Sequence, residues 1–409
     1  MWYNAFKTAE KKYCAKAFGF VRNFTSVRRR CPLIILQGAA KIKCFRKKMQ
    51  IKNLTLKNFR NYSEETFAFT DGLNVLFGRN AQGKTNCAEA VFYLCTGVSP
   101  RARRDRQMIK QGETSAEISA LASGRYGDVK ISATIFENGR EVRVNGNKIT
   151  RNADLLGNVF SVFFSPSELR LIQDGPDERR RFLNISISQL SRPYYTALLR
   201  YNKILEQRNN LLKNRDTGLV FDTLPVWDEQ LAKYAAVVMR HRTDFVCRLS
   251  PLAEEEHFRL TDGAEKLEVK MDCRYSGSDD EIAKAIYGDL QRNYERDVRL
   301  GFTGTGPHRD DLGFFINGQD AKNFASQGQT RTAALSVKLA EMEIFRQLSG
   351  EYPILILDDV MSELDLPRRK KLVERAQGMQ TILTCTHAER VLYGKQANKI
   401  RIEGGAIKR

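Results

Sequence analysis

The segment GRNAQGKT at residues 78 to 85 constrains the fold of this chain more than any other feature. It matches the pattern G-x-x-x-x-G-K-[ST] in every required position. The apolar run GLNVLFG precedes it and predicts a strand, whereas apolar residues recur at helical spacing after it. This helical stripe consists of Cys87, Ala88, Val91, Phe92 and Cys95. A strand, a glycine-rich turn and a helix in this order predict a phosphate-binding loop, and a surface glycine turn is the alternative.

A loop of this kind holds a nucleoside triphosphate. Its glycines let successive backbone N–H groups converge on the β-phosphate, at the positive end of the following helix. Lys84 is predicted to bridge β- and γ-phosphate oxygens, and the Thr85 hydroxyl to ligate Mg²⁺. The predicted nucleotide-binding residues are Gly78, Arg79, Asn80, Ala81, Gln82, Gly83, Lys84 and Thr85. The segment does not identify the base.

Two adjacent carboxylates end the apolar run in YPILILDDV, at residues 352 to 360. Four consecutive large apolar residues are typical of a parallel strand that is buried on both faces. Asp358 is predicted to hold Mg²⁺ through water. Asp359 is predicted to orient the attacking water as a general base, which contributes about 10²- to 10⁴-fold in rate. The simpler alternative is that the two acids cap the segment that follows.

A second glycine-bearing turn, FASQGQTRT at residues 324 to 332, opens another predicted helix. Free N–H groups at a helix start attract anions, so Ser326 and the amides around Gly328 are a second candidate phosphate contact. This turn lies about 240 residues after Lys84, whose loop already surrounds one face of the nucleotide. We therefore predict that the turn of one chain caps the γ-phosphate held by a second copy, in a two-fold pair with two nucleotides.

The chain has 409 residues and a formal net charge of +19, which favours an acidic partner such as nucleic acid. Residues 1 to 48 hold 13 Lys or Arg against the single Glu10, so only +7 remains for the other 361 residues. The eight cysteines form no C-x-x-C pair, and the four histidines lie far from any cysteine cluster. These features predict a cytoplasmic protein without a zinc site. No apolar run reaches the ~20 residues that a membrane span needs.

Residues 1 to 48 are predicted to be a basic extension, either disordered or the product of an upstream start. Met49 opens a clean strand pattern, MQIKNLTLKNF, and has the properties of the natural start. A signal or transit peptide is the alternative, because the apolar run CPLIILQGAA follows three arginines. That run is short and continues into KIKCFRKK, which fits a secretory signal poorly.

Sheet and helix signals alternate along the rest of the chain. Asn-Gly dipeptides at 138 and 145 punctuate short alternating runs and predict an antiparallel sheet layer between 116 and 150. After the apolar strand VFSVFFSP, charged helix-forming stretches predict a helical insert at 177 to 214, 227 to 249 and 279 to 295. Strand patterns return at GFFING, YPILILDDV and TILTCT. The sequence predicts an α/β fold with a mixed sheet, an antiparallel layer and an inserted helical lobe.

Four segments, GRNAQGKT, SQGQ, ILDDVMSELD and TH, occur in the order of the P-loop, signature turn, Walker B with D-loop, and switch histidine of ABC-type ATPases. Together with LKNFRNY, SPRARRDRQMI, FFSPSELRLIQDGPDERRRFLN and GPHRDDLGFFING, they make the chain similar to the RecF family of bacterial DNA repair proteins, an SMC-like branch. The resemblance begins at Met49. It implies an ABC-type ATPase head with lobe I at residues 49 to 175 and 299 to 409, and a helical lobe II at 176 to 298.

The resemblance also implies a function. Members of this family are ATP-dependent DNA-binding proteins that dimerise on ATP and are weak, DNA-stimulated ATPases. They work with RecO and RecR to load recombinase at single-strand gaps and stalled replication forks, on duplex DNA and gap junctions. The alternatives are an ATP-gated DNA clamp, in which hydrolysis is incidental, and a transporter-type ABC subunit. A transporter subunit would have its signature turn about half as far from the P-loop.

The resemblance assigns roles to individual positions. The residues for ATP and Mg²⁺ are Lys84, Thr85 and Asp358, those of the signature turn are Ser326, Gly328 and Gln329, and those of the D-loop and the switch are Asp365 and His387. Thr386 is an alternative for the switch position. ABC proteins place Glu where this chain has Asp359, which is one methylene shorter, so slow turnover is expected. No glutamine near FFSPSEL fits the Q-loop.

Arginine-rich clusters are candidates for contacts with DNA phosphates, although each could equally be a solvated surface. They are Arg101, Arg103, Arg104 and Arg106; Arg179, Arg180 and Arg181; and residues 368 to 371. The first cluster is favoured because it follows the predicted P-loop helix, and arginine suits phosphate oxygens. Few aromatic residues interleave with the clusters, which favours duplex backbone contacts over stacking on single strands. His308 and Arg309 are expected near the nucleotide or at the lobe junction.

Overall fold

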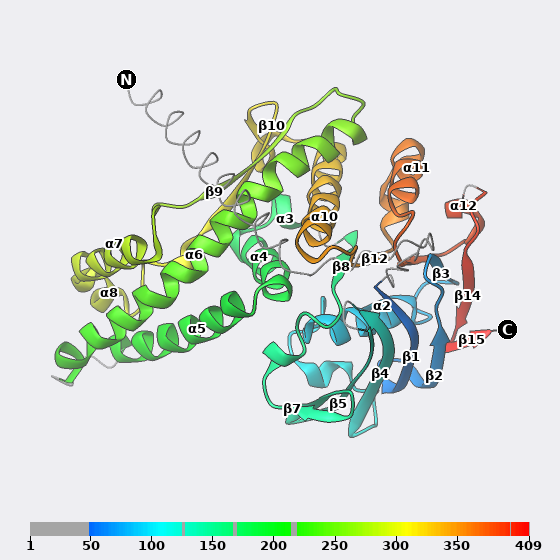
Figure 1. Ribbon diagram of the computed structural model, residues 1–409, viewed down its shortest axis with the longest axis horizontal. Helices are drawn as coiled ribbons and strands as arrows, with labels where there is room; N and C mark the ends of the chain where they lie inside the picture. Colours follow the sequence, from blue (N-terminus) through cyan, green and yellow to red (C-terminus); the bar gives the residue numbers. More distant parts are fainter. Residues whose placement is uncertain (1–48, 125–126, 167–169, 214–218, 393, 409) are drawn as a thin grey trace, which may run out of the picture. The chain divides into compact units, whose positions relative to one another are not determined.

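A six-stranded sheet carries the predicted phosphate-binding loop (Figure 1). Its strands run in the order β15-β14-β3-β13-β12-β8. All neighbours pair in parallel except β15, which is antiparallel to β14. The bounds are β3 (Leu73–Phe77), β8 (Ser161–Phe164), β12 (Ile354–Asp358), β13 (Thr381–Cys385), β14 (Asn398–Glu403) and β15 (Ala406–Lys408). The four apolar residues that open β12 are at most 1% exposed, which confirms the strand buried on both faces.

This computed structural model describes residues 49–124, 127–166, 170–213, 219–392 and 394–408. The predictions made for residues 1 to 48 lie outside the described residues.

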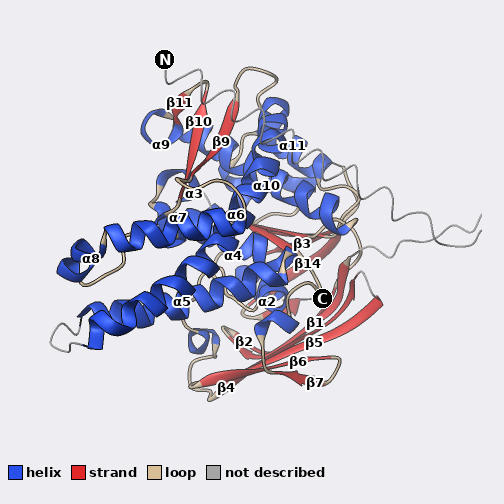
Figure 2. Ribbon diagram, turned by 60° about the vertical axis from the view of Figure 1, so that its left-hand side comes forward, coloured by secondary structure: helices blue, strands red, loops and turns tan. Residues whose placement is uncertain are grey.

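The predicted antiparallel layer is a second six-stranded sheet, in the order β2-β1-β4-β5-β6-β7 (Figure 2). Its strands are β1 (Gln50–Phe59), β2 (Tyr62–Ala68), β4 (Ser115–Gly124), β5 (Gly127–Phe136), β6 (Gly139–Val144) and β7 (Asn147–Ile149). In β1 the predicted apolar positions Ile51, Leu54, Leu56 and Phe59 are at most 1% exposed. The register between β1 and β4 shifts between residues 51 and 53, and this shift keeps Ile51 on the buried face.

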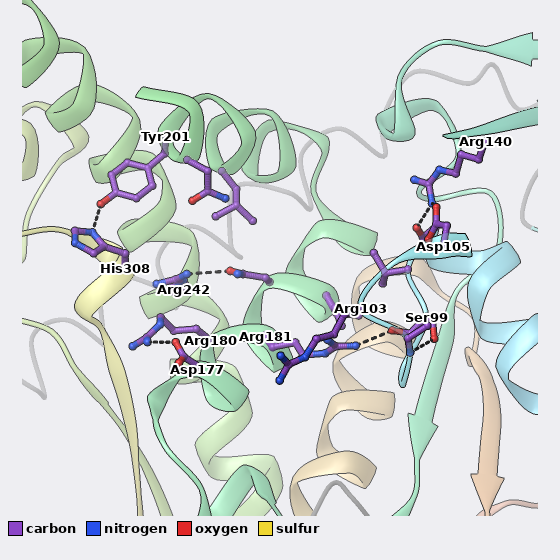
Figure 3. A pocket seen from close by; sticks show the side chains of 17 residues that line it. Ser99, Arg103, Asp105, Arg140, Asp177, Arg180, Arg181, Tyr201, Arg242 and His308 are labelled. Carbon is purple, nitrogen blue, oxygen red and sulfur yellow. Dashed lines mark hydrogen bonds and ion pairs between the residues drawn. The ribbon is translucent and has the colours of Figure 1, made fainter. Parts of the chain in front are cut away.

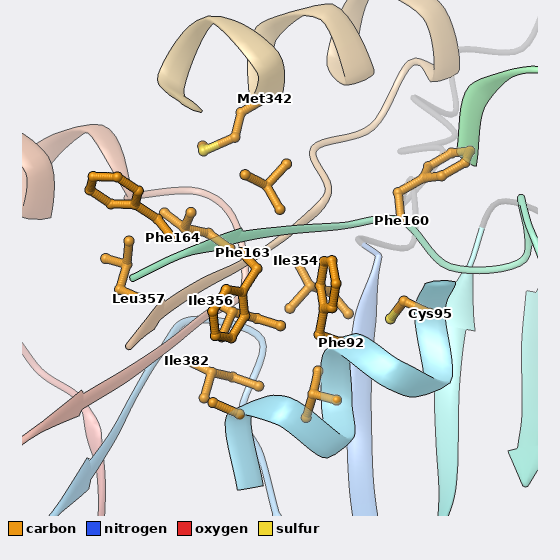
Figure 4. Close-up of a cluster of buried hydrophobic side chains, with 14 of the residues drawn as sticks. Phe92, Cys95, Phe160, Phe163, Phe164, Met342, Ile354, Ile356, Leu357 and Ile382 are labelled. Atoms are coloured by element: carbon orange, nitrogen blue, oxygen red, sulfur yellow. The ribbon is translucent and has the colours of Figure 1, made fainter. Parts of the chain in front are cut away.

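The P-loop helix α2 (Lys84–Thr96) is more deeply buried than its predicted apolar stripe indicates. Every residue from Cys87 to Thr96 is buried, including Glu89. The reason is that α2 packs against strands of both six-stranded sheets, so it has no solvent face along most of its length. Figure 4 shows Phe92 of α2 and Met342 of the long helix α10 (Gln327–Ser349) among the apolar side chains around β8 and β12.

The two predicted hairpins differ in their turns. Between β6 and β7, Asn145 and Gly146 have φ of 52° and 83°, as the Asn-Gly signal requires. Between β5 and β6, Phe136 pairs with Gly139, so the turn is centred one residue before the predicted dipeptide. Neither of its two central residues has a positive φ, so that turn needs no glycine.

The predicted helical insert is present and contains long helices. They are α3 (Arg170–Gln173), α4 (Pro176–Leu190), α5 (Arg192–Lys213), α6 (Leu219–Leu260), α7 (Asp279–Arg292) and α8 (Tyr294–Leu300). Helix α6 extends well beyond the predicted range and includes Pro225 and Pro251. Helices α5 and α6 lie side by side in Figures 1 and 2, and with α7 they enclose a separate apolar cluster around Tyr201, Leu231 and Ile286.

The insert is not purely helical, contrary to the prediction. Strand β9 (Leu267–Asp272) pairs antiparallel with β10 (Asp311–Ile316), and β10 pairs with β11 (Gln319–Asp320) to form a three-stranded sheet. The segment LEVKMD alternates apolar and charged residues as a strand does, but it spans only 6 residues between long helical stretches, and its partner strand begins some forty residues later. The division into lobes at 176 and 298 stays a proposal.

The remaining helical elements connect these layers. They are α9 (Ala321–Phe324), α11 (Leu366–Arg375), α12 (Glu389–Leu392) and the 3₁₀ helices η2 (Asp105–Met108), η3 (Asn152–Asp154), η5 (Pro307–Arg309) and η6 (Val360–Glu363). Among the described residues, no helix has the length and apolar character needed to cross a membrane.

Candidate nucleotide-binding site

Two glycines of the loop after β3 stand where other residues would clash. Gly78 and Gly83 have φ of 147° and 117°, in the region that favours glycine. A Cβ on Gly78 would lie 2.3 Å from the carbonyl oxygen of Ile402, and one on Gly83 would lie 2.8 Å from the Tyr62 hydroxyl. The loop therefore runs so close to neighbouring backbone and side chains that only glycine fits.

Neighbouring turns hold this loop from outside. The Gln82 carbonyl accepts hydrogen bonds from Gly405 N (3.0 Å) and from Asn61 Nδ2 (3.0 Å). The Tyr62 hydroxyl donates to the Gly83 carbonyl at 2.9 Å. No role was predicted for Asn61 and Tyr62, although both lie in the segment LKNFRNY, which carries part of the family resemblance.

Lys84 lies across the loop that precedes it. Its ammonium donates to the carbonyls of Gly78 (2.8 Å) and Arg79 (2.7 Å), and only 7% of the residue is exposed. Burial lowers the pKa of Lys84, whereas the nearby carboxylates of Asp359 and Asp358 raise it. The Lys84 ammonium is thus held inside the loop, near the carboxylates at the end of β12.

The predicted metal residues lie in direct contact. Thr85 Oγ1 donates to Asp358 Oδ1 at 2.7 Å, and Thr384 at the end of β13 donates to the same oxygen at 2.8 Å. Burial raises the pKa of Asp358, and these two hydrogen bonds oppose part of the shift. A hydroxyl and a carboxylate at this distance are hard oxygen ligands, which suit Mg²⁺ with its retained waters and substrate phosphates. In the described part of the chain, no group of three His, Cys, Asp or Glu forms another metal site.

Asp359 occupies a strained position beside this pair. Its φ of 54° is left-handed, and its side chain is exposed. Its N–H donates to Thr384 Oγ1 at 3.0 Å, and its carbonyl accepts from Ser362 at 2.7 Å. These bonds hold a conformation that costs a non-glycine residue about 1 kcal/mol, and such outliers concentrate at functional sites. His387 is exposed nearby on the chain after β13, and its Nδ1 lies 3.0 Å from Thr386 Oγ1, so both switch candidates stay open.

The second glycine turn begins α10 and is exposed. Ser326 Oγ accepts from Gln329 N at 3.2 Å, while Gln329 Oε1 accepts from Ser326 N at 2.9 Å, which forms a capping box. One predicted free N–H is therefore already used inside the helix. Gln329 also donates to Glu265 at 2.9 Å. Among the described residues, no hydrogen bond or ion pair joins this turn to the P-loop.

An ion pair joins the start of α10, which follows the second glycine turn, to the segment just before Asp365. Arg331, in the first turns of α10, contacts Glu363 at 2.5 Å, two residues before Asp365. Asp365 itself is exposed and caps α11 by accepting from Arg368 N at 3.0 Å. The structure thus gathers the P-loop, Asp358 and Asp359 into one group, and the signature turn and Asp365 into another.

The arginine candidates separate into different environments. Arg179 is 4% exposed and binds Asp311 with two hydrogen bonds of 2.5 and 2.8 Å, so its prediction as a DNA contact is corrected: it is a buried structural residue. Arg101 contacts Glu89 and Asn86 of α2, each at 2.6 Å, and thus lies against the P-loop helix. Arg104 and Arg106 are exposed.

The segment GTGPHRDD, residues 304 to 311, contacts helices α5 and α6. His308 Nδ1 is 2.5 Å from the Tyr201 hydroxyl, and its Nε2 is 2.9 Å from the Thr303 carbonyl. Burial lowers the pKa of His308 to about 4, so the ring is neutral at pH 7. Asp310 binds the buried Arg242 of α6 at 3.0 Å. The contact with Tyr201 joins His308 to helix α5, and its place at a lobe junction stays a proposal together with the lobe boundaries.

Comparison with known proteins is consistent with this geometry. The family model described as the RecF/RecN/SMC N terminal domain matches residues 50–408. A DNA replication and repair protein RecF from Lachnoclostridium phytofermentans is 43% identical over 343 residues, which cover 83% of this chain and 94% of the relative. Another from Ruminiclostridium cellulolyticum is 40% identical over 368 residues, which cover 88% of this chain and 99% of the relative.

Solved structures give the same result. A structure of the recombination mediator protein RecF with ATP, in the RecFOR pathway, has a TM-score of 0.83 at 33% identity and covers 88% of this chain and 97% of its own. An Smc head bound to the C-winged helix domain of ScpA has a TM-score of 0.52 at 15% identity, which shows a shared fold alone. The predicted ABC-type, SMC-like head is confirmed.

Proposed function

This chain belongs to the RecF family, and on that premise we propose that it is an ATP-dependent DNA-binding repair protein that dimerises on ATP. One observation carries the nucleotide part of the proposal. The Thr85 hydroxyl lies 2.7 Å from the Asp358 carboxylate, although 273 residues separate them in the chain. This contact supports the proposal that both side chains hold magnesium, because a P-loop hydroxyl and a carboxylate at the end of a neighbouring strand meet there, near the Lys84 ammonium.

Different residues of the chain would bind the phosphates, hold the metal ion and activate the water. The amides between Gly78 and Gly83 hold the β-phosphate, and Lys84 exchanges its loop carbonyls for β- and γ-phosphate oxygens. Thr85 and Asp358 would hold Mg²⁺, which when bound offsets the charge of the β- and γ-phosphates. Asp359, exposed at the end of β12, orients the attacking water and accepts its proton. Because this side chain is one methylene shorter than the glutamate of ABC proteins, we expect ATP hydrolysis to be slow.

The γ-phosphate needs a cap, and we assign this role to the signature turn of a second copy. Ser326 and Gly328 are exposed, and within the described residues no hydrogen bond or ion pair joins them to the P-loop of their own chain. Phe324 is 70% exposed and lies two residues before Ser326, and Leu366 is 53% exposed and follows Asp365 of the predicted D-loop. Exposed large apolar side chains beside polar contacts are typical of protein interfaces.

The further assignments rest on the relatives. The curated relatives are named DNA replication and repair proteins, and the solved ones are named recombination mediators in the RecFOR pathway. For this chain we propose DNA with duplex segments and gap junctions as the nucleic-acid partner. We propose RecO and RecR as protein partners in loading recombinase, and the cytoplasm as the location.

Duplex DNA binding is expected to be independent of sequence, to weaken with salt and to strengthen with ATP. The reason is that arginine contacts with phosphates release counterions, so that log K falls with log [salt] by about 0.9 per phosphate. The measurement is a fluorescence titration of a labelled duplex at two salt concentrations, with and without a nonhydrolysable ATP analogue. Equal affinity under all four conditions would refute the proposal.

A further inference from the structure

A cavity of about 700 Å³ lies outside the nucleotide site, between the loop that follows α2 and helices α4 and α5 (Figure 3). No residue of the P-loop lines it. Its charged lining residues are Arg103, Arg140, Arg180, Arg181, Arg242, Asp105 and Asp177. His308 also lines the cavity and is neutral at pH 7, so five positive charges face two negative ones. Such a cavity attracts anions.

Two of the five arginines are committed to the fold. Arg140 contacts Asp105 at 3.1 Å, the Tyr93 hydroxyl at 2.9 Å and the Gly97 carbonyl at 2.5 Å. Arg242 is 2% exposed and is held by Asp310 and by the Pro307 carbonyl. These guanidinium groups form the walls of the cavity and have few donors left for a ligand.

The other three arginines retain donors. Within the described part of the chain, the side chain of Arg103 makes no hydrogen bond or ion pair, and it is exposed. Arg181 donates one hydrogen bond, to the Ser99 carbonyl at 2.7 Å. Arg180 donates to the Asp310 carbonyl and pairs with Asp177, a side chain that is 94% exposed and therefore weakly bound.

The lining points to phosphate groups and not to bases. A guanidinium presents a planar fork that matches two phosphate oxygens, and here three such groups surround one space. The only aromatic side chain among the lining residues, apart from the His308 ring, is Tyr201, and its hydroxyl is engaged by that histidine. A ligand held mainly by stacking would need more aromatic surface.

The cavity is also connected to the P-loop helix by hydrogen bonds. Arg181 donates to the carbonyl of Ser99, and the hydroxyl of Ser99 donates to Glu89 at 2.5 Å. Glu89 is fully buried on α2 and also binds Arg101, which reaches Asn86 two residues after Lys84. Burial alone would raise the pKa of Glu89, but the bonds from Arg60 and Ser99 and the charge of Arg101 lower it, so this carboxylate is charged.

We propose that Arg103, Arg180 and Arg181 form a phosphate site for the DNA backbone, and that Ser99 transmits its occupation to the P-loop helix through Glu89. The inference rests on the proposed function and adds residues and a coupling route to it. When Arg181 turns to a DNA phosphate, the Ser99 carbonyl loses its donor and the Ser99–Glu89 contact shifts. Ser99 is a positioning residue in this scheme.

The first test compares two variants of equal charge. Replacing Arg103, Arg180 and Arg181 together by alanine is expected to weaken duplex binding at least ~10-fold and to reduce the salt slope by about 3. The control replaces three exposed basic residues of the α7–α8 region, Arg274, Lys284 and Arg296. Equal losses in both proteins would overturn the proposal, because the effect would then follow net charge alone. If the triple variant is unfolded by circular dichroism, the exposed Arg103→Ala must show a slope reduced by about 1.

The same proteins distinguish two sources of phosphate. Titration with pyrophosphate in place of DNA shows whether the cavity serves a free anion. A triple variant that loses pyrophosphate affinity but keeps its DNA affinity would contradict the backbone assignment. Arg103 lies outside the route through Ser99, so ATP binding and ATP-dependent dimerisation are expected to be unchanged in Arg103→Ala. A failure of the DNA assignment in that variant therefore leaves the nucleotide proposal standing and can be told apart from its failure.

The second test concerns Ser99. In Ser99→Ala, duplex affinity without nucleotide is expected to stay within about twofold of the wild type, whereas the increase caused by the ATP analogue disappears. Ser99→Thr keeps the hydroxyl and should restore the increase. An undiminished nucleotide effect in Ser99→Ala, or no restoration by threonine, would rule out this route.

Discussion

Lys84→Ala is expected to lose ATP binding and ATP-dependent dimerisation together. The ammonium already donates two hydrogen bonds inside the loop, and the same donors would serve phosphate oxygens. Two hydrogen bonds to a charged group contribute roughly 1.5–3 kcal/mol each, so ATP affinity should fall at least ~100-fold. The measurements are calorimetry with ATP and light scattering with and without the nucleotide.

The exposed Lys57 of β1 supplies a control of equal charge. Lys57→Ala should bind ATP and dimerise as the wild type does. A Lys84→Ala protein that folds, fails to bind ATP and nevertheless dimerises on its addition would count against nucleotides at the interface.

Asp359→Asn is expected to lower ATP turnover about 10²- to 10⁴-fold while leaving ATP affinity and dimerisation close to wild type. The amide cannot accept the proton of the attacking water. Asparagine is the suitable substitution because it tolerates the left-handed φ of 54° at this position, so the turn after β12 should be preserved. Single-turnover measurements with saturating ATP separate this chemical step from product release.

The rate of ATP turnover in Asp359→Asn also distinguishes an ATPase that uses Asp359 as its base from an ATP-gated clamp. A rate equal to wild type would show that Asp359 is not the base and would favour an ATP-gated clamp in which hydrolysis is incidental. A matched variant, Asp359→Glu, retains the carboxylate. It should keep measurable turnover, although glutamate fits the left-handed backbone less well than aspartate does.

The parts of the fold that the sequence predicted are those with strong local patterns. The P-loop combines a strand, two obligatory glycines and a helix within a few residues, and the strand before Asp358 is uniformly apolar. Such patterns are decided by steric limits and by burial of neighbouring residues. They therefore identified β3, α2 and β12 without knowledge of the rest of the chain.

The parts that the sequence missed depend on distant partners. Strand β9 is a short segment that pairs with β10, a partner some forty residues later, and α2 is buried along most of its length because it packs against two sheets. Arg179 looks like its neighbour Arg180 in the sequence, but one faces Asp311 in the interior and the other faces a cavity. An arginine run does not indicate which members point inward, since that depends on helix phase and on the surface opposite.

In the proposed dimer, each nucleotide is held by Lys84 of one chain and the signature turn of another. Mixing Lys84→Ala with Ser326→Arg tests this directly, because a mixed pair contains one site with an intact lysine and an intact turn from different chains. Light scattering with a nonhydrolysable ATP analogue should show monomers for each variant alone and dimers in the one-to-one mixture. A mixture that stays monomeric, or a Ser326→Arg protein that dimerises alone as the wild type does, would contradict the claim.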